Sequence, residues 1–240
     1  MMRALALLLA LVAGPASAVT CADDTFEGHS FTACTVDAAT EDLRLFHRNA
    51  DGGVLGGWTA LGASVAPQSV QFAMNAGMYH DDRRAVGLYI QNGVETAPLV
   101  TRAGPGNFGL LPNGLLCLTD DSANVIESLT FELTKPTCRD ATQSGPMLVI
   151  DGKLHPRFIP DSPSLHVRNG VGTMADGKTA IFAISNDAVN FDTFGRYFRD
   201  VLKTPNALFL DGSVSRLYAP ELNRADFGFA ALGPIVGVVQ

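Results

Sequence analysis

Four short polar segments, each combining a hydrogen-bonding or charged side chain with glycine, interrupt an otherwise apolar sequence. They are Asn75-Ala76-Gly77-Met78-Tyr79, Ser144-Gly145-Pro146, Arg168-Asn169-Gly170-Val171-Gly172 and Leu210-Asp211-Gly212-Ser213. Three of them adjoin a run with the composition of a buried strand. Because rigid strands can deliver the polar groups at their ends into one cleft, we expect the four segments to form a single site.

Arg168 is the candidate contact for an anion. A guanidinium presents paired donors that match carboxylate or phosphate oxygens, and the glycines that follow it, Gly170 and Gly172, let backbone N–H groups approach an anion closely. The alternative is a structural arginine that pairs with a carboxylate at the edge of the domain.

Two aspartates are candidates for a catalytic carboxylate. Asp211 follows the short apolar run Ala207–Leu210, and Asp187 follows the run Ala180–Ile184. A carboxylate at the end of a buried strand can act as an acid or a ligand, and Ser213 beside Asp211 suits an anion or sugar pocket. Either aspartate could instead be an ordinary turn residue, or a residue approaching a helix.

The remaining polar segments suit a sugar or a turn. Asn75 can donate and accept hydrogen bonds, Tyr79 can also stack, and the neighbouring His80 could act as an acid or base. Ser144 offers a hydroxyl on a rigid turn, although a plain turn explains it equally well. The nucleophile motif G-x-S-x-G is missing around Ser144, which argues against a serine hydrolase.

No residue spacing indicates a metal or another cofactor, and none is predicted. Asp187, Asn190 and Asp192 resemble part of a calcium loop, but the glycine and the terminal glutamate of such a loop are missing. The histidines without metal-ligand spacing are His29, His47, His155 and His166.

The N-terminal residues 1–18 resemble an export signal. Arg3 precedes the apolar run Ala4–Ala13, and Ala16-Ser17-Ala18 is a small-residue cleavage site. A buried helix or a membrane anchor is the alternative, but the run is too short to span a bilayer. We therefore expect cleavage after Ala18, a mature domain over residues 19–240, and a periplasmic or secreted protein.

Composition indicates one folded domain without a membrane span. The sequence has 240 residues, of which 47% are hydrophobic and 17% charged, so disorder is not expected. The net charge of −7 argues against a nucleic-acid partner.

Four cysteines fall into two local pairs, Cys21 with Cys34 and Cys117 with Cys138. An exported chain meets oxidising conditions, so two disulfides are expected, and of the three possible connectivities locality favours these pairs. A four-cysteine zinc site is the alternative, but no C-x-x-C spacing supports it.

Turn signals and apolar runs predict an α+β domain with a mixed, largely antiparallel sheet and a few helices. The hairpin signals are Asn92-Gly93, Asn113-Gly114, Asp151-Gly152 and Asp176-Gly177. The strand-like runs are Leu43–His47, Val70–Met74, Val86–Gln91, Val94–Val100, Leu115–Thr119, Met147–Ile150, Lys178–Ser185 and Ala207–Leu210. One helix is predicted where Phe191, Phe194, Phe198, Val201 and Leu202 share a face, with Asn190 or Asp192 as its cap and Pro205 as its stop. A second helix is predicted near Ala60–Ser69.

In order and content, the four segments resemble those of the phosphodiester glycosidase (NAGPA-like) family, from about Val70 to the C-terminus. The family pattern runs from an asparagine-glycine-aromatic motif through S-G-P and an arginine-glycine loop before D-G to L-D-G with following serines. The chain is most similar to compact exported bacterial members. It departs from the pattern in two segments, both at presumed pocket positions. The usual N-G-G-F-F is Asn75-Ala76-Gly77-Met78-Tyr79 here, and the usual L-D-G-G-G-S is Leu210-Asp211-Gly212-Ser213-Val214-Ser215.

The resemblance implies hydrolysis of the bond between a sugar anomeric carbon and a phosphodiester oxygen, with a phosphate-linked sugar or glycan as substrate. In this reading Arg168 clamps the phosphate with help from Ser144, and Asp211, or else Asp187, assists at the anomeric carbon. The implied substrate-binding residues are Asn75, Gly77, Tyr79, Ser144, Gly145, Asn169, Gly170, Gly212 and Ser213. The alternative is a protein that binds an anionic envelope glycan without cleaving it.

Overall fold

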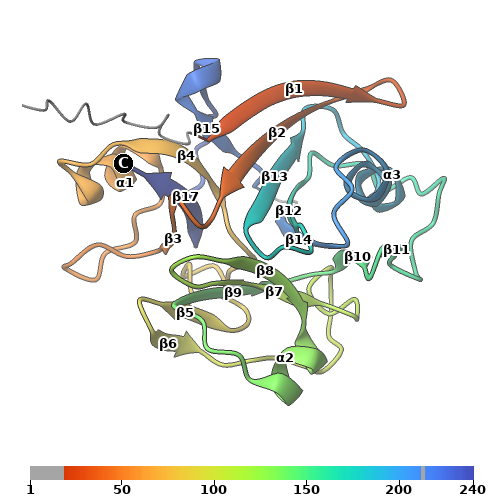
Figure 1. The fold of residues 1–240 in the computed structure, drawn as a ribbon, viewed down its shortest axis with the longest axis horizontal. Coiled ribbons are helices and arrows are strands. Elements are labelled where there is room, and N and C mark those ends of the chain that lie inside the picture. Colours follow the sequence, from red (N-terminus) through yellow and green to blue (C-terminus); the bar gives the residue numbers. More distant parts are fainter. Residues whose placement is uncertain (1–18, 212–213) are drawn as a thin grey trace, which may run out of the picture.

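The computed structural model describes residues 19–211 and 214–240, which form three antiparallel sheets around a shared core (Figure 1). Every strand pairing between described residues is antiparallel. The helices are short: α1 (Trp58–Val65), α2 (Ser128–Thr134) and α3 (Phe191–Arg196), which continues as a π-helical turn, η1 (Tyr197–Val201). The predicted α+β class with a largely antiparallel sheet is confirmed.

The first sheet has seven strands and each of the others has five. The first has the order β1 (Thr20–Phe26), β2 (His29–Asp37), β13 (Thr179–Ser185), β12 (Asn169–Thr173), β14 (Asn206–Asp211), β10 (Met147–Ile150) and β11 (Lys153–Leu154). The second has the order β16 (Arg224–Ala225), β15 (Leu217–Ala219), β4 (Val70–Asn75), β17 (Ile235–Val239) and β3 (Asp42–Phe46), and the 3₁₀ turn η2 (Pro220–Leu222) precedes β16. The third has the order β6 (Val94–Ala97), β5 (Tyr89–Gln91), β9 (Asp140–Ser144), β7 (Gly114–Leu118) and β8 (Ala123–Glu127).

The inner faces of the three sheets share one apolar core, and a helix packs on the outer face of each sheet. The shared core includes Val36, Leu45, Phe72, Leu116, Phe182, Leu208 and Val236. On the outer faces, Phe194 of α3 packs with the first sheet, Leu61 of α1 with the second, and Phe131 of α2 with the third. Burial of both faces of the central strands, such as β7 and β17, explains why these strands are apolar throughout instead of alternating.

Three of the four predicted hairpin turns are confirmed. Asn92-Gly93 joins β5 to β6, Asp151-Gly152 joins β10 to β11, and Asp176-Gly177 joins β12 to β13, with positive φ at each of these glycines. The prediction for Asn113-Gly114 is wrong, because this pair leads into β7. A Cβ on Gly114 would lie 2.8 Å from the Ile126 carbonyl, so close strand approach explains this glycine.

Both predicted helices are confirmed. The longer one is α3 with η1, and its cap is Asn190, whose side-chain oxygen accepts a hydrogen bond from Thr193 N–H at 2.9 Å. Phe194 and Phe198 of the predicted stripe are fully buried against the seven-stranded sheet. The second is α1, which begins and ends earlier than the predicted range.

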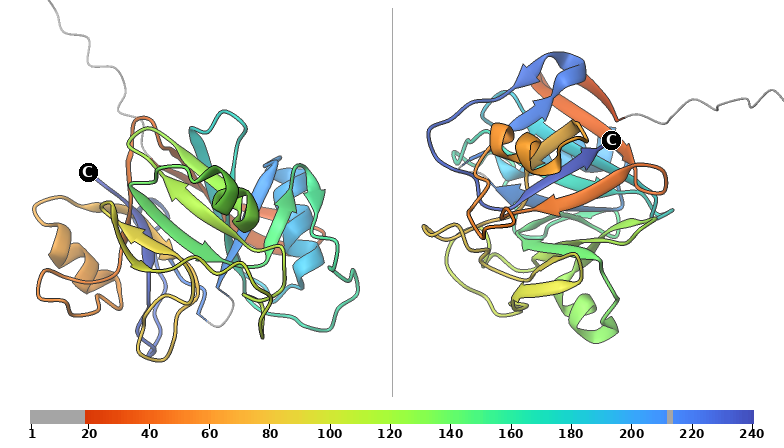
Figure 2. Two further views of the ribbon diagram at one scale, coloured as in Figure 1. Left: turned by 90° about the horizontal axis from the view of Figure 1, so that it is seen from below. Right: turned by 90° about the vertical axis from the view of Figure 1, so that its left-hand side faces the viewer.

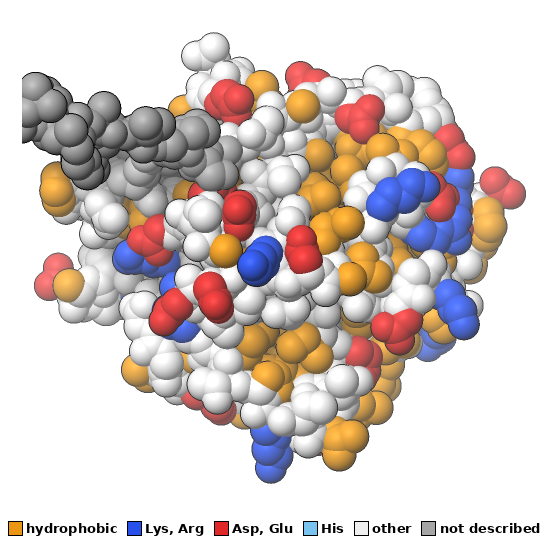
Figure 3. Space-filling model, in the orientation of Figure 1, with side chains coloured by type: hydrophobic (Ala, Val, Ile, Leu, Met, Phe, Trp, Pro, Cys, Tyr) orange, Lys and Arg blue, Asp and Glu red, His pale blue; other side chains and the backbone are white. Residues whose placement is uncertain are grey.

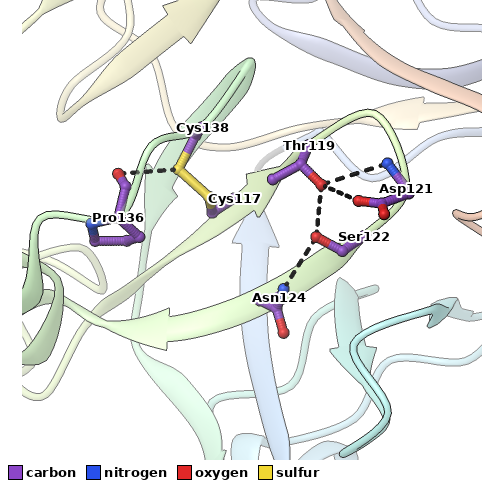
Figure 4. Close-up of a disulfide and its surroundings, with 7 residues drawn as sticks. All are labelled: Cys117, Thr119, Asp121, Ser122, Asn124, Pro136 and Cys138. Atoms are coloured by element: carbon purple, nitrogen blue, oxygen red, sulfur yellow. Dashed lines mark hydrogen bonds between the residues drawn. A yellow bond between two sulfur atoms is a disulfide. The ribbon is translucent and has the colours of Figure 1, made fainter.

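Both predicted disulfides are confirmed. Cys21 and Cys34 are cross-strand partners in the β1–β2 hairpin. Cys117 of β7 bonds Cys138, which precedes β9, beside the Thr119–Ser122 turn (Figure 4). With sequence separations of 13 and 21, each bond stabilises the fold by about 3 kcal/mol on a chain-entropy estimate.

Charges of both signs are interspersed on the face seen in Figure 3, and hydrophobic side chains collect there beside α3. Within residues 19–211 and 214–240, no helix is long and apolar enough to cross a membrane. The predicted signal, residues 1–18, lies outside the described residues, as do Gly212 and Ser213.

Candidate active site

Three segments that are distant in sequence meet where β4, β12 and β14 approach one another. Asn75 ends β4, Asn169 begins β12, and Asp211 ends β14. Asn169 pairs with Asp211, and the register shifts between Asn169 and Gly170, as at a β-bulge. Such an irregularity turns a strand end away from regular pairing, and it lies beside the candidate carboxylate.

Two fully buried asparagines join these segments. Asn169 Nδ2 donates to the Asn75 carbonyl at 3.0 Å, and Asn75 Nδ2 donates to Asn169 Oδ1 at 3.3 Å. The same Asn169 oxygen accepts from Asp211 N–H at 3.1 Å, and Asn75 Oδ1 accepts from Arg216 N–H at 2.9 Å. The asparagine pair therefore fixes the backbone at both Asp211 and Arg216.

Asp211, Tyr79 and Arg216 lie close together at one side of this cluster. Asp211 is buried, with a fractional exposure of 7%, while Tyr79 and Arg216 are half-buried. Burial raises the pKa of the Tyr79 phenol, the Asp211 carboxylate raises it further, and Arg83 and Arg216 oppose the rise. The phenol therefore lies in the combined electrostatic field of a carboxylate and two guanidiniums.

The segment before β17 supports Tyr79. The Tyr79 hydroxyl donates to the Ala231 carbonyl at 3.4 Å. The Tyr79 ring packs on Gly233, where a Cβ would lie 2.4 Å from ring atom Cδ1. Figure 2 shows the corresponding segments around residues 80 and 230 side by side at one edge of the molecule. The absence of a side chain at Gly233 is thus what admits the tyrosine.

The S-G-P segment and the predicted glycines serve close packing behind this edge. Ser144 is fully buried, and its hydroxyl donates to the Leu210 carbonyl at 2.7 Å, next to Asp211. Gly77 has φ +100°, and a Cβ there would lie 2.7 Å from Thr142 Oγ1. Steric contact also accounts for Gly145, where a Cβ would meet Asn113 at 2.7 Å, and for Gly170, where it would meet the Leu208 carbonyl at 2.8 Å.

Arg168 lies on the other face of the seven-stranded sheet, fully buried in the layer that contains α3. Its Nε donates to the Val189 carbonyl at 2.8 Å and one Nη donates to the Ser164 carbonyl at 2.9 Å. The guanidinium stacks 3.7 Å from the Phe191 ring centroid, and its other Nη has no hydrogen-bond partner.

Burial lowers the pKa of Arg168 to about 10, and no ion pair reaches it within the described part of the chain. The alternative role for Arg168, a structural arginine, was expected to involve a carboxylate partner. Backbone carbonyls and an aromatic ring contact its guanidinium instead. Because the side chain is not exposed, contact with a phosphate would require the covering segment around Ser164 to move.

Asp187 lies in an exposed loop after β13, where its carboxylate accepts a hydrogen bond from Ser30 N–H at 2.7 Å. This bond ties Asp187 to the start of β2 and does not join it to the asparagine pair.

Arg216 was not among the predicted site residues. It lines an open cavity of ≈560 Å³ with Val167, Val214, Ser215, Asp226, Phe227, Gly228, Phe229 and Ala230. Its guanidinium lies against Gly228, where a Cβ would be 2.1 Å from Nη2, and it forms no ion pair with any described residue. The available sequence signal is that Arg216 is the one basic residue between Lys203 and Arg224, five positions after Asp211.

A second cavity, of ≈570 Å³, lies between β3 and the β5–β6 hairpin, and His80 is the one candidate residue of the sequence analysis that lines it. His47 and His80 are among its lining residues, and His47 Nε2 lies 2.7 Å from the Arg83 carbonyl. Among residues 19–211 and 214–240, no group of three or more histidine, cysteine, aspartate or glutamate side chains could hold a metal ion.

Comparisons with known proteins identify relatives of this chain and solved structures that share its fold. The uncharacterized protein YigE of Escherichia coli (strain K12) is 35% identical over 215 residues, covering 88% of this chain and 84% of that protein. The catalytic domain of zebrafish N-acetylglucosamine-1-phosphodiester alpha-N-acetylglucosaminidase, auto-inhibited by its pro-peptide, has a TM-score of 0.59 at 14% identity, covering 95% of this chain and 84% of that chain. A hypothetical protein from Synechocystis has a TM-score of 0.60 at 12% identity, covering 92% and 61%.

At these identities the two solved structures establish a shared fold. The sequence model of the NAGPA family, described as phosphodiester glycosidase, matches residues 68–239, which include the asparagine pair, Asp211 and Arg216. The chain therefore belongs to the phosphodiester glycosidase family.

Proposed function

We propose that this protein is an exported hydrolase that cleaves the bond between a sugar anomeric carbon and a phosphodiester oxygen. Water supplies the hydroxyl that the sugar carbon gains, and the other product is a phosphate monoester. The family supports hydrolase chemistry of this kind. The observation that carries the proposal is Asp211, held at the end of β14 by Asn169, with its carboxylate and Arg216 both close enough to shift the pKa of Tyr79.

The leaving group sets what the site must provide. A phosphate monoester has a second pKa of about 6, so it departs without strong protonation, and the site must chiefly stabilise charge. In this proposal Arg216 contacts the phosphate, because it is the cation that lines the cavity and has no ion pair among described residues. Arg168 is then a positioning residue that holds the start of β12 from the opposite face.

The sugar carbon becomes cation-like in the transition state of such a reaction. We assign Asp211 to stabilise that carbon or to activate water, and Tyr79 to orient the sugar. Asn75 and Asn169 act through Asp211 and Arg216, whose backbone they fix. Asp187 is the second candidate for this carboxylate. Comparing Asp187→Asn with Asp211→Asn would show which of the two aspartates the reaction needs.

Export is part of the proposal. Its support is the signal-like sequence of residues 1–18 together with the Cys21–Cys34 and Cys117–Cys138 disulfides.

The test is turnover of a panel of sugar 1-phosphodiesters by the purified mature protein and by matched variants. We expect Asp211→Asn and Arg216→Ala each to lower kcat/KM at least ~100-fold, as loss of a charge-stabilising group does. Arg102→Ala removes an exposed arginine elsewhere and should keep wild-type turnover. Saturable binding of these esters without any product would favour the glycan-binding alternative, and equal turnover by Asp211→Asn would refute the assigned carboxylate.

A further inference from the structure

The loop between β16 and β17 presents two phenylalanines to solvent beside the candidate site. Phe227 is 83% exposed and Phe229 is 100% exposed, and their rings contact edge to face with centroids 5.4 Å apart. Both line the cavity that contains Arg216. Full exposure of two adjacent aromatic rings leaves apolar area in water, and such area often marks a recognition surface.

The polar side chains of this cavity are mostly engaged by the protein itself. The Asp226 carboxylate accepts from Leu217 N–H at 2.9 Å and pairs with Arg224 at 2.9 Å, which neutralises its charge. The Ser215 hydroxyl lies 2.8 Å from the Asp211 carbonyl and 3.1 Å from the Val167 carbonyl, both of which are hydrogen-bond acceptors. Arg216 is the remaining charge, because it has no ion pair within the described residues.

The remaining side chains of the lining are apolar, those of Val167, Val214, Phe227, Phe229 and Ala230, and Gly228 contributes backbone. Val167 is itself 37% exposed, so the apolar area continues past the loop. One cation beside an apolar surface complements a ligand with one anionic group and an apolar body. A second sugar would instead bring several hydroxyls, and each hydroxyl that loses water needs a replacement hydrogen-bond partner.

We propose that the cavity beside Arg216 receives an apolar aglycone, so that the substrate class is a sugar 1-phosphodiester of a hydrophobic alcohol. The phosphate contacts Arg216, and the alkyl or aryl group packs on Phe227 and Phe229. This inference rests on the proposed function for the identity of the ligand. The surface itself can be tested by binding alone.

The binding test compares methyl phosphate, hexyl phosphate and glucose 6-phosphate by calorimetry with the mature protein. Hexyl phosphate should bind roughly tenfold more tightly than methyl phosphate, the gain expected if about two of its methylenes are buried. The double variant Phe227→Ser, Phe229→Ser should lose this gain and leave methyl phosphate binding unchanged, whereas Arg216→Ala should weaken both. Leu133→Ser, at an 84% exposed position on α2, is the matched control and should change neither.

Equal affinity for hexyl and methyl phosphate would overturn the inference. A Phe227- and Phe229-dependent gain for glucose 6-phosphate with none for hexyl phosphate would overturn it in favour of a sugar aglycone.

Turnover of methyl and hexyl diesters of one sugar separates this inference from the proposed function. Cleavage of both at equal kcat/KM, unaffected by the double variant, refutes the aglycone site and keeps the glycosidase. Cleavage of neither, with the hexyl preference intact in binding, refutes the glycosidase and supports the apolar anion site.

Discussion

Replacing Asn169 by alanine tests whether the asparagine pair supports the site. The Asn169 side chain makes four hydrogen bonds. Its Nδ2 donates to the Asn75 carbonyl, and its Oδ1 accepts from the Asn75 amide, from Asp211 N–H and from the Ser215 hydroxyl. Ser215 keeps the Val167 and Asp211 carbonyls as acceptors, so the other three groups lose a partner. At about 1–3 kcal/mol for each buried group left unpaired, the three groups should lower the free energy of unfolding by at least about 3 kcal/mol.

The assay is urea denaturation of wild type, Asn169→Ala and the control Asn124→Ala, whose side chain makes one long hydrogen bond of 3.5 Å to Ser122, away from the site (Figure 4). The control should lose less than about 1 kcal/mol. A loss below that value for Asn169→Ala would refute the reasoning.

Asn169→Asp gives a second readout of the same contact. It places a carboxylate oxygen where Nδ2 now lies 3.0 Å from the Asn75 carbonyl. Protonation restores a donor there, so the folded state binds the proton more tightly than the unfolded state. This variant should therefore gain stability relative to wild type as the pH falls from neutral, and a flat difference would contradict the assigned hydrogen bond.

Three further predictions concern single side chains. Arg168→Ala should lower the free energy of unfolding by about 3–5 kcal/mol, because alanine leaves a cavity and leaves the Val189 and Ser164 carbonyls without this donor. Arg168→Met should lower it by clearly less, because methionine fills most of that space; equal losses in urea would contradict this. Gly77→Ala should lower the free energy of unfolding by about 1–3 kcal/mol more than Gly93→Ala does. Both glycines have positive φ, but only the Cβ added at Gly77 would clash, with Thr142 Oγ1. Calorimetric Tm values of the two variants test this. Burial lowers the pKa of His47 below its ordinary 6.5, so the unfolded state binds more protons than the folded state. The free energy of unfolding should therefore fall as the pH drops below ~6.5. His47→Gln should reduce this dependence on pH in denaturation at neutral and acidic pH.

Local signals predicted the parts of the fold that depend on few residues. The Asp176-Gly177 hairpin, the Asn190 cap and the Cys21–Cys34 bond each rest on short-range geometry, and all are confirmed. The β1 strand was missed because most of its outward positions are polar and exposed, which leaves no apolar alternation to detect.

The prediction was better for the segments that meet at the candidate site than for the roles of their individual residues. Asn75, Asn169 and Asp211 do meet, as their positions at strand ends suggested. Arg168 and Asn169 are adjacent, so in a strand their side chains point to opposite faces, and Arg168 packs under α3. Arg216 and the Phe227–Phe229 loop come together through tertiary contacts, for which the sequence has no local signal.

The most direct measurement of the central claim locates the bond that breaks. A sugar 1-phosphodiester is hydrolysed in ¹⁸O-labelled water, and the label is followed by ³¹P NMR and mass spectrometry. The proposal predicts the label on the anomeric hydroxyl of the sugar, an unlabelled phosphate monoester, and loss of the reaction in Asp211→Asn. Label in the phosphate would show cleavage at phosphorus and would contradict the glycosidase assignment.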